Sequence, residues 1–156
     1  MSDVSPFPDG YPRICPGLAC AGAGAAIDFY TAIFGATVRM KMDGPGGSVV
    51  HSELLVGDSV LMVGDPVPEI GFTDPKAVGG SPVNLMVYVA DADAAFAAAL
   101  TAGATAITPM TDQFYGDRSG AFEDPWGHRW TVATHIEDVS PEEMERRMAE
   151  MMDAAG

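Results

Sequence analysis

Residues 23–35 read AGAAIDFYTAIFG, and Ala36-Thr37 follow them directly. The larger apolar side chains of this stretch recur three and four residues apart, which predicts a helix that buries one side and ends at Gly35. The same order returns later, where the alanine-rich segment 92–102 ends at Gly103 and continues with Ala104-Thr105. A repeated junction of this kind predicts two equivalent units packed together.

Strand patterns surround both predicted helices in the same order. The apolar segment 11–21 precedes the first helix, and 82–90 precedes the second. After each helix three more strands are expected, at 36–42, 49–56 and 59–63 in the first half and at 106–110, 119–123 and 129–134 in the second. The strand and helix patterns therefore predict two βαβββ modules, one over residues 11–63 and one over 82–137. A linker over 64–81, which contains three prolines and two adjacent glycines, joins them. The fold class is α+β, a single domain over 1–156 in which a curved mixed sheet encloses a cavity.

A helix is also predicted at the end of the chain, over residues 140–152. Ser140 is a helix N-cap, Pro141 suits the first helical position, and Glu143 completes a capping box. Met144, Met148 and Met151 then share one side of the helix, a pattern more typical of core or interface packing than of a ligand site.

Composition narrows the classes of partner. The formal net charge is -14 and 47% of the residues are hydrophobic, so the chain can build a core, and its charge opposes binding to nucleic acid or anionic membranes. No segment approaches the ~20 apolar residues of a membrane span, and the first ten residues do not resemble a secretory signal. Cys15 and Cys20 lie too far apart along one predicted strand to form a disulfide, which favours reduced thiols and a cytoplasmic protein.

Two βαβββ units, the stretch AAIDFYTAIFGA and the stretch DPWGHRW together resemble the vicinal-oxygen-chelate superfamily. This superfamily includes glyoxalase I, extradiol dioxygenases and fosfomycin- and bleomycin-resistance proteins, and residues 113–144 look closest to its PhnB-like branch. The resemblance covers roughly residues 11–148. It implies that βαβββ units pair, either inside one chain or by exchange between two chains. Together with the methionine side of the last helix, this predicts a homodimer.

The superfamily places metal ligands on the first and last strand of each module. Carried over by the matching motifs, those positions fall on Cys15, Met62, Asn84 and Thr131. A thiol, a thioether, an amide and a hydroxyl are a poor set for a hard divalent cation, so no metal cofactor is expected there. An alternative metal site could use two His and Glu pairs with the same spacing, formed by His51, Glu53, His135 and Glu137.

The resemblance therefore favours a small-molecule-binding protein similar to the bleomycin-resistance group, one that sequesters a neutral or cationic, partly aromatic compound. The alternative is a metal-dependent lyase, isomerase or dioxygenase that uses a displaced site. No catalytic constellation is recognised. The expected ligand-binding residues alternate on strands facing the cavity or lie at its rim: Cys15, Met62, Asn84, Met86, Tyr88 and Thr131 inside, with Phe114, Tyr115 and Arg118 at the rim.

Overall fold

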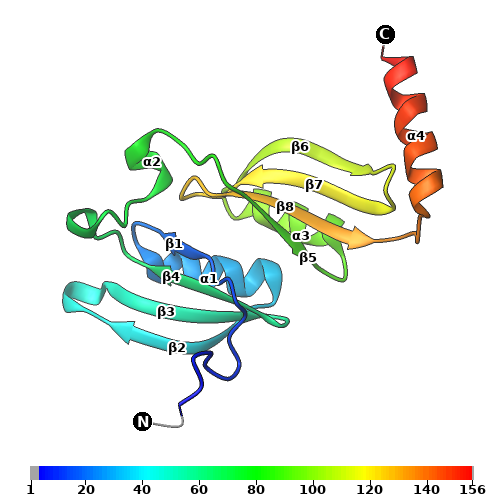
Figure 1. Ribbon diagram of the computed structural model, residues 1–156. Helices are drawn as coiled ribbons and strands as arrows, with labels where there is room; N and C mark the ends of the chain where they lie inside the picture. The colour runs from blue at the N-terminus through cyan, green and yellow to red at the C-terminus, as the bar shows by residue number, and fades with distance from the viewer. Residues whose placement is uncertain (1–3, 156) are drawn as a thin grey trace. The chain divides into compact units, whose positions relative to one another are not determined.

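The computed structural model describes residues 4–155, and the chain divides into two compact units. The first unit holds the chain up to Ser81 together with Trp126–His128. The second holds Pro82–Pro125 and the chain from Arg129 onward. Each unit contains one four-stranded mixed sheet and one long helix that packs against it (Figure 1). This arrangement confirms the α+β class and the tandem βαβββ modules. Residues 1–3 and 156 of the expected domain lie outside the described residues.

The first sheet has the strand order β1-β4-β3-β2. Its elements are β1 (Gly17–Ala19), α1 (Ala23–Phe34), β2 (Thr37–Asp43), β3 (Val49–Val56) and β4 (Ser59–Gly64). Strand β1 is parallel to β4, and the other neighbours are antiparallel. The apolar side of α1 forms the core of this unit with the sheet, where Tyr30, Leu54 and Val63 are almost fully buried. The spacing of apolar residues in 23–35 predicted this helix because burial of one side stabilises it.

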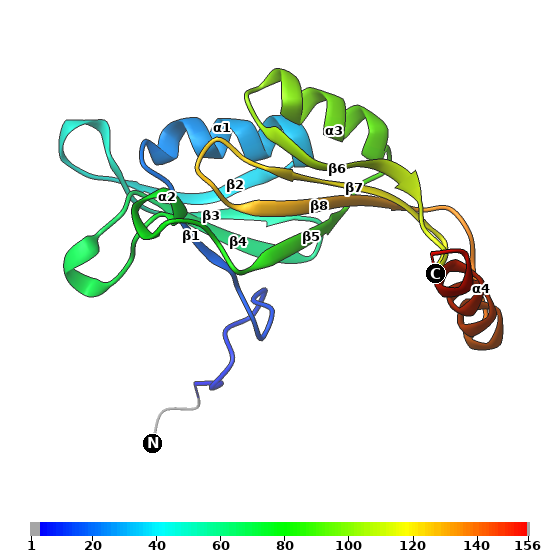
Figure 2. The ribbon, with the colours of Figure 1, turned by 90° about the horizontal axis from the view of Figure 1, so that it is seen from above.

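The second sheet repeats this order as β5-β8-β7-β6. Its elements are β5 (Asn84–Tyr88), α3 (Ala92–Thr101), β6 (Thr105–Asp112), β7 (Asp117–Glu123) and β8 (Arg129–His135). Helix α3 begins at Asp91, whose side chain accepts a hydrogen bond from the amide of Ala94 at 2.9 Å, as expected of an N-cap. It lies along one face of its sheet (Figure 2), and the rings of Phe96 and Phe122 meet there at 6.2 Å between centroids.

The first predicted strand is much shorter than the sequence suggested. Strand β1 covers only Gly17–Ala19, although apolar residues extend over 11–21. Pro12 and Pro16 carry no amide hydrogen, so neither can donate to a strand ladder. The segment before β1 makes side-chain contacts instead, since the hydroxyl of Tyr11 binds Glu53 and the thiol of Cys15 donates to the carbonyl of Pro12 at 3.5 Å.

The predicted linker and the turn between β7 and β8 both contribute to the first unit. The segment after β4 contains a turn of 3₁₀-helix, Pro68–Ile70, and a short helix, α2 (Pro75–Val78); another 3₁₀ turn, Pro45–Gly47, joins β2 to β3. In the other turn, the indole nitrogen of Trp126 donates to the carbonyl of Ala21 at 3.0 Å. His128 is buried, with Nε2 at 2.9 Å from the carbonyl oxygen of Ala19.

Helix α4 (Pro141–Ala154) ends the described chain. Its start confirms the local prediction, because the hydroxyl of Ser140 accepts from the amide of Glu143 at 3.2 Å. The helix runs two residues further than the predicted end at residue 152. Among residues 4–155 no helix combines the length and the apolar character needed to cross a membrane.

Candidate functional site

The second sheet brings several of the predicted site residues onto one face. Asn84, Met86 and Tyr88 alternate along β5, and Met86 lies opposite Thr131 on the parallel neighbour β8. The amide of Asn84 donates to the hydroxyl of Thr131 at 3.0 Å. Met86 and Tyr88 remain 45% and 59% exposed. We call the side of this sheet opposite α3 the Tyr88 face; it carries Asn84, Met86, Tyr88, Asp117, Thr131 and His135.

Asp117 joins two of these side chains into a polar network. Its side chain is only 4% exposed, and its Oδ2 accepts a 2.7 Å hydrogen bond from the hydroxyl of Tyr88. Its Oδ1 lies 2.8 Å from Nδ1 of His135, whose Nε2 in turn lies 3.0 Å from Asp138 Oδ1. A buried carboxylate needs such partners, because burial without them is costly. The network therefore fixes the orientation of the Tyr88 phenol.

The network changes the proton affinities of its members. The hydrogen bond to Asp117, then burial, raises the pKa of Tyr88 above its ordinary value. The hydrogen bonds to Asp138 and then Asp117 raise the pKa of His135. Both shifts favour the protonated form, because each proton lies between its own group and a carboxylate.

A tight loop before β7 carries two aromatic rings, Phe114 and Tyr115. The rings of Phe114 and Tyr115 meet edge to face, with centroids 5.2 Å apart. Tyr115 also lies close enough to Tyr88 to contribute to the raised pKa of that phenol. The loop is held by Gly116, whose carbonyl accepts from the amides of Ile136 and Glu137 at 2.9 and 3.0 Å. The chain can pass so close to β8 only because residue 116 has no side chain.

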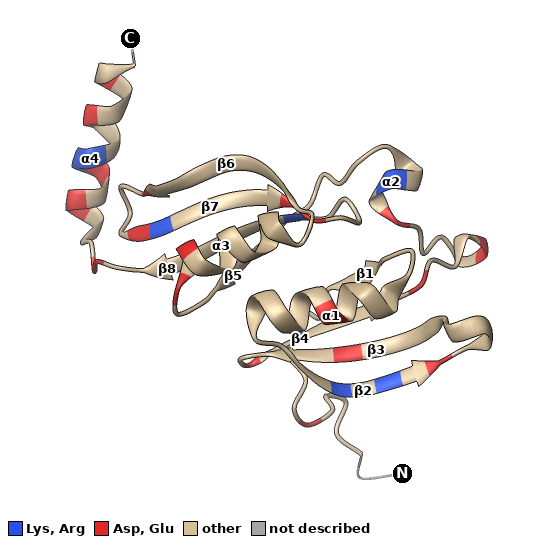
Figure 3. Cartoon of the chain, turned by 180° about the vertical axis from the view of Figure 1, so that it is seen from behind, with Lys and Arg blue, Asp and Glu red and all other residues tan. Residues whose placement is uncertain are grey.

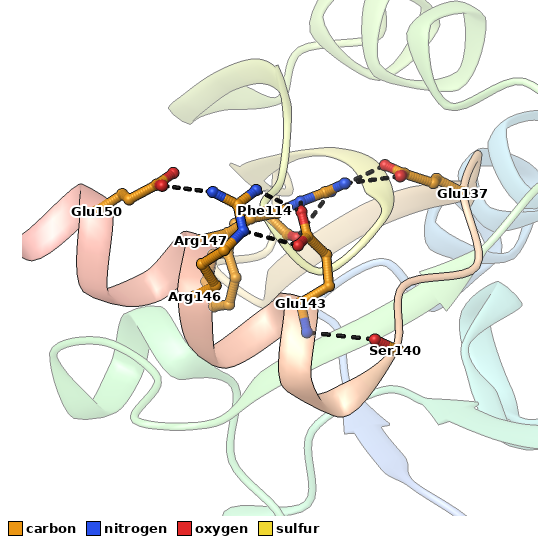
Figure 4. A network of polar contacts seen from close by, with 7 residues as sticks. All are labelled: Phe114, Glu137, Ser140, Glu143, Arg146, Arg147 and Glu150. Atoms are coloured by element: carbon orange, nitrogen blue, oxygen red, sulfur yellow. Dashed lines mark hydrogen bonds and ion pairs between the residues drawn. The ribbon is translucent and has the colours of Figure 1, made fainter.

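Helix α4 is hydrogen-bonded to the loop that carries Phe114 and Tyr115, here called the aromatic loop (Figure 4). Arg147 donates to both carboxylate oxygens of Glu137 at 2.7 and 2.9 Å and to the carbonyl of Phe114 at 3.3 Å. It also donates to Glu143 at 2.7 Å within the helix. One guanidinium thus connects α4, the end of β8 and the aromatic loop.

Arg118, which was predicted at the rim with Phe114 and Tyr115, is engaged in ion pairs. It points to the α3 side of the sheet, where its guanidinium binds the carboxylate of Asp93 at 2.6 and 2.8 Å and Asp112 at 2.9 Å. These bonds raise its pKa further. Neighbouring residues of a strand point to opposite faces, so Asp117 faces His135 while Arg118 faces α3.

In the first unit, the predicted ligand-binding residues Cys15 and Met62 lie in neighbouring segments, since the amide of Met62 donates to the carbonyl of Pro16 at 2.9 Å. Met62 pairs with Gly17 of β1 and with Glu53 of β3, while Cys15 lies before the strand. Glu53 is the polar centre here: Arg39 donates two hydrogen bonds to its Oε2 at 2.5 and 2.9 Å, and the Tyr11 hydroxyl approaches both oxygens. The hydrogen bonds from Arg39 hold the pKa of Glu53 below its usual range.

The two His and Glu pairs of the alternative metal site differ in geometry. His51 Nε2 lies 3.3 Å from Glu53 Oε1, so the first pair meets. The two side chains of the second pair bind different partners: Glu137 binds Arg147, whereas His135 binds Asp117 and Asp138. Within residues 4–155 no three His, Cys, Asp or Glu side chains gather as a metal-binding group. His51 could still offer an imidazole, but the carboxylate beside it is already neutralised by Arg39.

Comparison with known proteins decides the family. Residues 16–132 match the model of the Glyoxalase/Bleomycin resistance protein/Dioxygenase superfamily. The chain belongs to this superfamily. An uncharacterized protein of Mycobacterium bovis is 36% identical over 145 residues, which cover 91% of this chain and 95% of the relative. The uncharacterized At5g48480 protein of Arabidopsis thaliana is 30% identical over 129 residues, 78% of this chain and 77% of that protein.

Solved structures agree with this assignment. The X-ray structure of the At5g48480 gene product has a TM-score of 0.61 at 29% identity and covers 79% of this chain and 98% of its own. TioX from Micromonospora sp. ML1 has a TM-score of 0.60 at 24% identity, with 83% and 100% covered. A PhnB protein from Bacillus cereus, described as a putative 3-demethylubiquinone-9 3-methyltransferase, has 0.62 at 18% identity, with 79% and 99% covered. The last two likenesses show the fold alone.

In the second module, the two positions that correspond to metal-ligand positions of the superfamily lie next to each other. Asn84 and Thr131 are hydrogen-bonded to each other and supply an amide and a hydroxyl. Neutral oxygen donors of this kind bind a divalent cation weakly without a carboxylate beside them. The sequence had predicted both residues but not Asp117, which is the buried acid of this face.

Proposed function

We propose that this protein binds a small, partly aromatic, neutral or cationic molecule on the Tyr88 face, without a metal ion. The observation that carries the proposal is the exposure of Met86 and Tyr88 beside the hydrogen-bonded Asn84–Thr131 pair. Ligand sites typically combine apolar and aromatic surface with a few oriented polar groups. A phenol fixed by Asp117 and a flexible thioether supply that combination.

The aromatic loop extends the proposed contact surface. Phe114 and Tyr115 are half-buried, and Gly116 and Arg147 hold their loop at the end of β8. A ring stacked on one of these side chains gains about 0.5–1.5 kcal/mol beyond the burial of its area. Rigid aromatic groups lose little entropy on binding, so the loop suits recognition of a planar ring.

The charge of the protein favours cations over anions. Acidic residues outnumber basic ones 22 to 8, and Figure 3 shows them in both units and on α4. A field of this sign raises the encounter rate of cationic ligands and loses strength as salt is added. The proposed mechanism is binding without a chemical step. The affinity for the ligand and the abundance of the protein then determine how much ligand is sequestered.

A thermal-shift screen of planar neutral and cationic compounds, run in EDTA, tests the proposal. A ligand that binds only the folded state raises the melting temperature. For any compound found, Met86→Ala should weaken binding about tenfold, through loss of apolar contact. Met148→Ala is the matched control, since Met148 on α4 is 50% exposed and lies off the Tyr88 face.

The proposal fails if none of the compounds shifts the melting temperature in EDTA but added divalent metal restores a shift. It also fails if Met86→Ala and Met148→Ala bind every ligand as the parent does. The first outcome would favour a metal-dependent enzyme of the superfamily. The second would place the ligand elsewhere on the chain.

A further inference from the structure

The hydroxyl of Tyr88 already donates its one proton to a hydrogen bond within the protein. A phenol offers one donor and two acceptor lone pairs, and the Tyr88 proton is donated to Asp117 Oδ2 at 2.7 Å. Tyr88 as a whole is 59% exposed. Toward anything that approaches from outside the protein, the oxygen of Tyr88 can therefore only accept a hydrogen bond.

The direction of that hydrogen bond is fixed by the rest of the network. Asp117 is buried, and its second oxygen is held by Nδ1 of His135 at 2.8 Å, so the carboxylate cannot easily turn away. Carboxylate oxygens accept and do not donate, so Tyr88 has no alternative orientation that frees its proton while this contact lasts. The raised pKa of Tyr88 agrees with a phenol that keeps its proton.

The contact also makes the oxygen a better acceptor. A hydrogen bond donated to a carboxylate shifts electron density onto the donor oxygen, and such chains strengthen one another in surroundings of low dielectric constant. Asp138 adds a further carboxylate at the other nitrogen of His135, 3.0 Å away. Two acidic groups and one imidazole around a phenol leave an excess of negative charge, which a cation would offset.

We propose that the Tyr88 oxygen is an acceptor subsite that selects ligands carrying a cationic N–H group, such as a protonated amine, next to an aromatic ring. This inference rests on the proposed function, because it assigns the ligand class of the same face. The ammonium hydrogen would reach the Tyr88 oxygen while the ring contacts Met86 and the neighbouring Phe114 and Tyr115. Quaternary ammonium compounds of the same shape and charge lack the hydrogen and would bind less tightly.

A matched pair of probes separates N–H donation from charge and ring contact. Naphthylmethylammonium and naphthylmethyl-trimethylammonium are both cations with the same planar ring, but only the first has N–H donors. Calorimetric titration of the full chain should give a dissociation constant about tenfold or more lower for the first, since a hydrogen bond that involves a charged group has about that effect.

Two variants locate the effect on one atom. Tyr88→Phe keeps the ring but removes the acceptor, so the preference for the N–H probe should fall to about onefold while the trimethyl probe binds within about twofold of its affinity for the parent. Tyr11→Phe removes a hydroxyl that binds Glu53 in the first unit and is not part of the Tyr88 face, and should leave the preference unchanged. Comparing both probes on both variants forms a cycle that cancels the intrinsic difference between the probes.

Each outcome decides a different claim. If both probes bind the parent equally, or if Tyr88→Phe retains the preference, the acceptor subsite is wrong and the proposed binding function stands. If neither probe binds the parent at millimolar concentration, the acceptor subsite is also wrong, whereas the proposed binding function is decided separately by the thermal-shift screen, which includes neutral compounds.

Discussion

Replacement of Gly116 by alanine should strongly destabilise the second unit. Gly116 has φ +99°, and a Cβ built on it would lie 2.0 Å from the carbonyl oxygen of Glu137 and 3.0 Å from Cγ2 of Val139. The first distance is far below van der Waals contact with a backbone atom, which cannot rotate away as a side chain can. The end of β8 would have to move off the aromatic loop.

Gly103 provides the matched control for this substitution. It has φ +101°, almost the same backbone angle, but its Cβ would lie 3.7 Å from Cγ of Pro125, an ordinary contact. Gly103→Ala therefore reports the conformational cost alone, about 1–3 kcal/mol for a side chain in this region. Both glycines belong to the second unit, so the two variants probe the same unfolding reaction.

The extra cost of Gly116→Ala follows from the hydrogen bonds that the clash would break. The carbonyl of Gly116 accepts from the amides of Ile136 and Glu137, and two such bonds contribute about 1–3 kcal/mol together. Gly116→Ala should thus be about 1–3 kcal/mol less stable than Gly103→Ala. Urea unfolding followed by circular dichroism measures both. Equal stability of the two variants would refute the argument that residue 116 must lack a side chain.

Three further predictions concern titration and assembly. The pKa of His135 should lie above its ordinary value of about 6.5. Its contribution to stability is therefore complete below that pH and is lost as pH rises through the raised pKa. Asp138→Asn should lower the pKa of His135 in an NMR titration, and an unchanged pKa would contradict the assigned cause. The Glu143 carboxyl should titrate with a pKa of about 2, because Arg146 and Arg147 donate hydrogen bonds to it. Its contribution to the stability of α4 is therefore present above the ordinary carboxyl pKa and is lost as pH falls toward 2. Glu143→Gln should remove that part of the acid dependence of helicity measured by circular dichroism, and an acid profile like the parent's would contradict this. The exposed methionines of α4 predict a homodimer: light scattering should give about twice 16.3 kDa and Met148→Glu should lower it, whereas a parent mass of 16.3 kDa would refute the dimer.

The elements that the sequence predicted well are those set by local chemistry. Helix α4 begins at Pro141, directly after its cap Ser140, because a cap, a proline and a glutamate lie within four consecutive positions. Strand β3 has the predicted bounds, Val49–Val56, since turn residues delimit it on both sides. The first strand was predicted too long, because apolar composition does not show that Pro12 and Pro16 cannot donate to a ladder.

The site was predictable only in part, because its contacts join distant residues. Alternation along β5 was enough to place Met86 and Tyr88 on one face. Asp117 was missed since its partners lie 29 and 18 residues away along the chain, and no local pattern connects them. One partner of Arg118 was missed for the same reason, because Asp93 lies on α3, 25 residues earlier in the chain.

Calorimetric titration of EDTA-treated protein with naphthylmethylammonium tests the central claim most directly, when parent and Tyr88→Ala are compared. The account predicts saturable binding to the parent with elemental analysis showing well under one equivalent of zinc, nickel, manganese or iron, and weaker binding to the variant because a stacked ring and an acceptor are lost. Binding that disappears in EDTA and returns with a divalent metal, or binding that the loss of Tyr88 leaves unchanged, would contradict it.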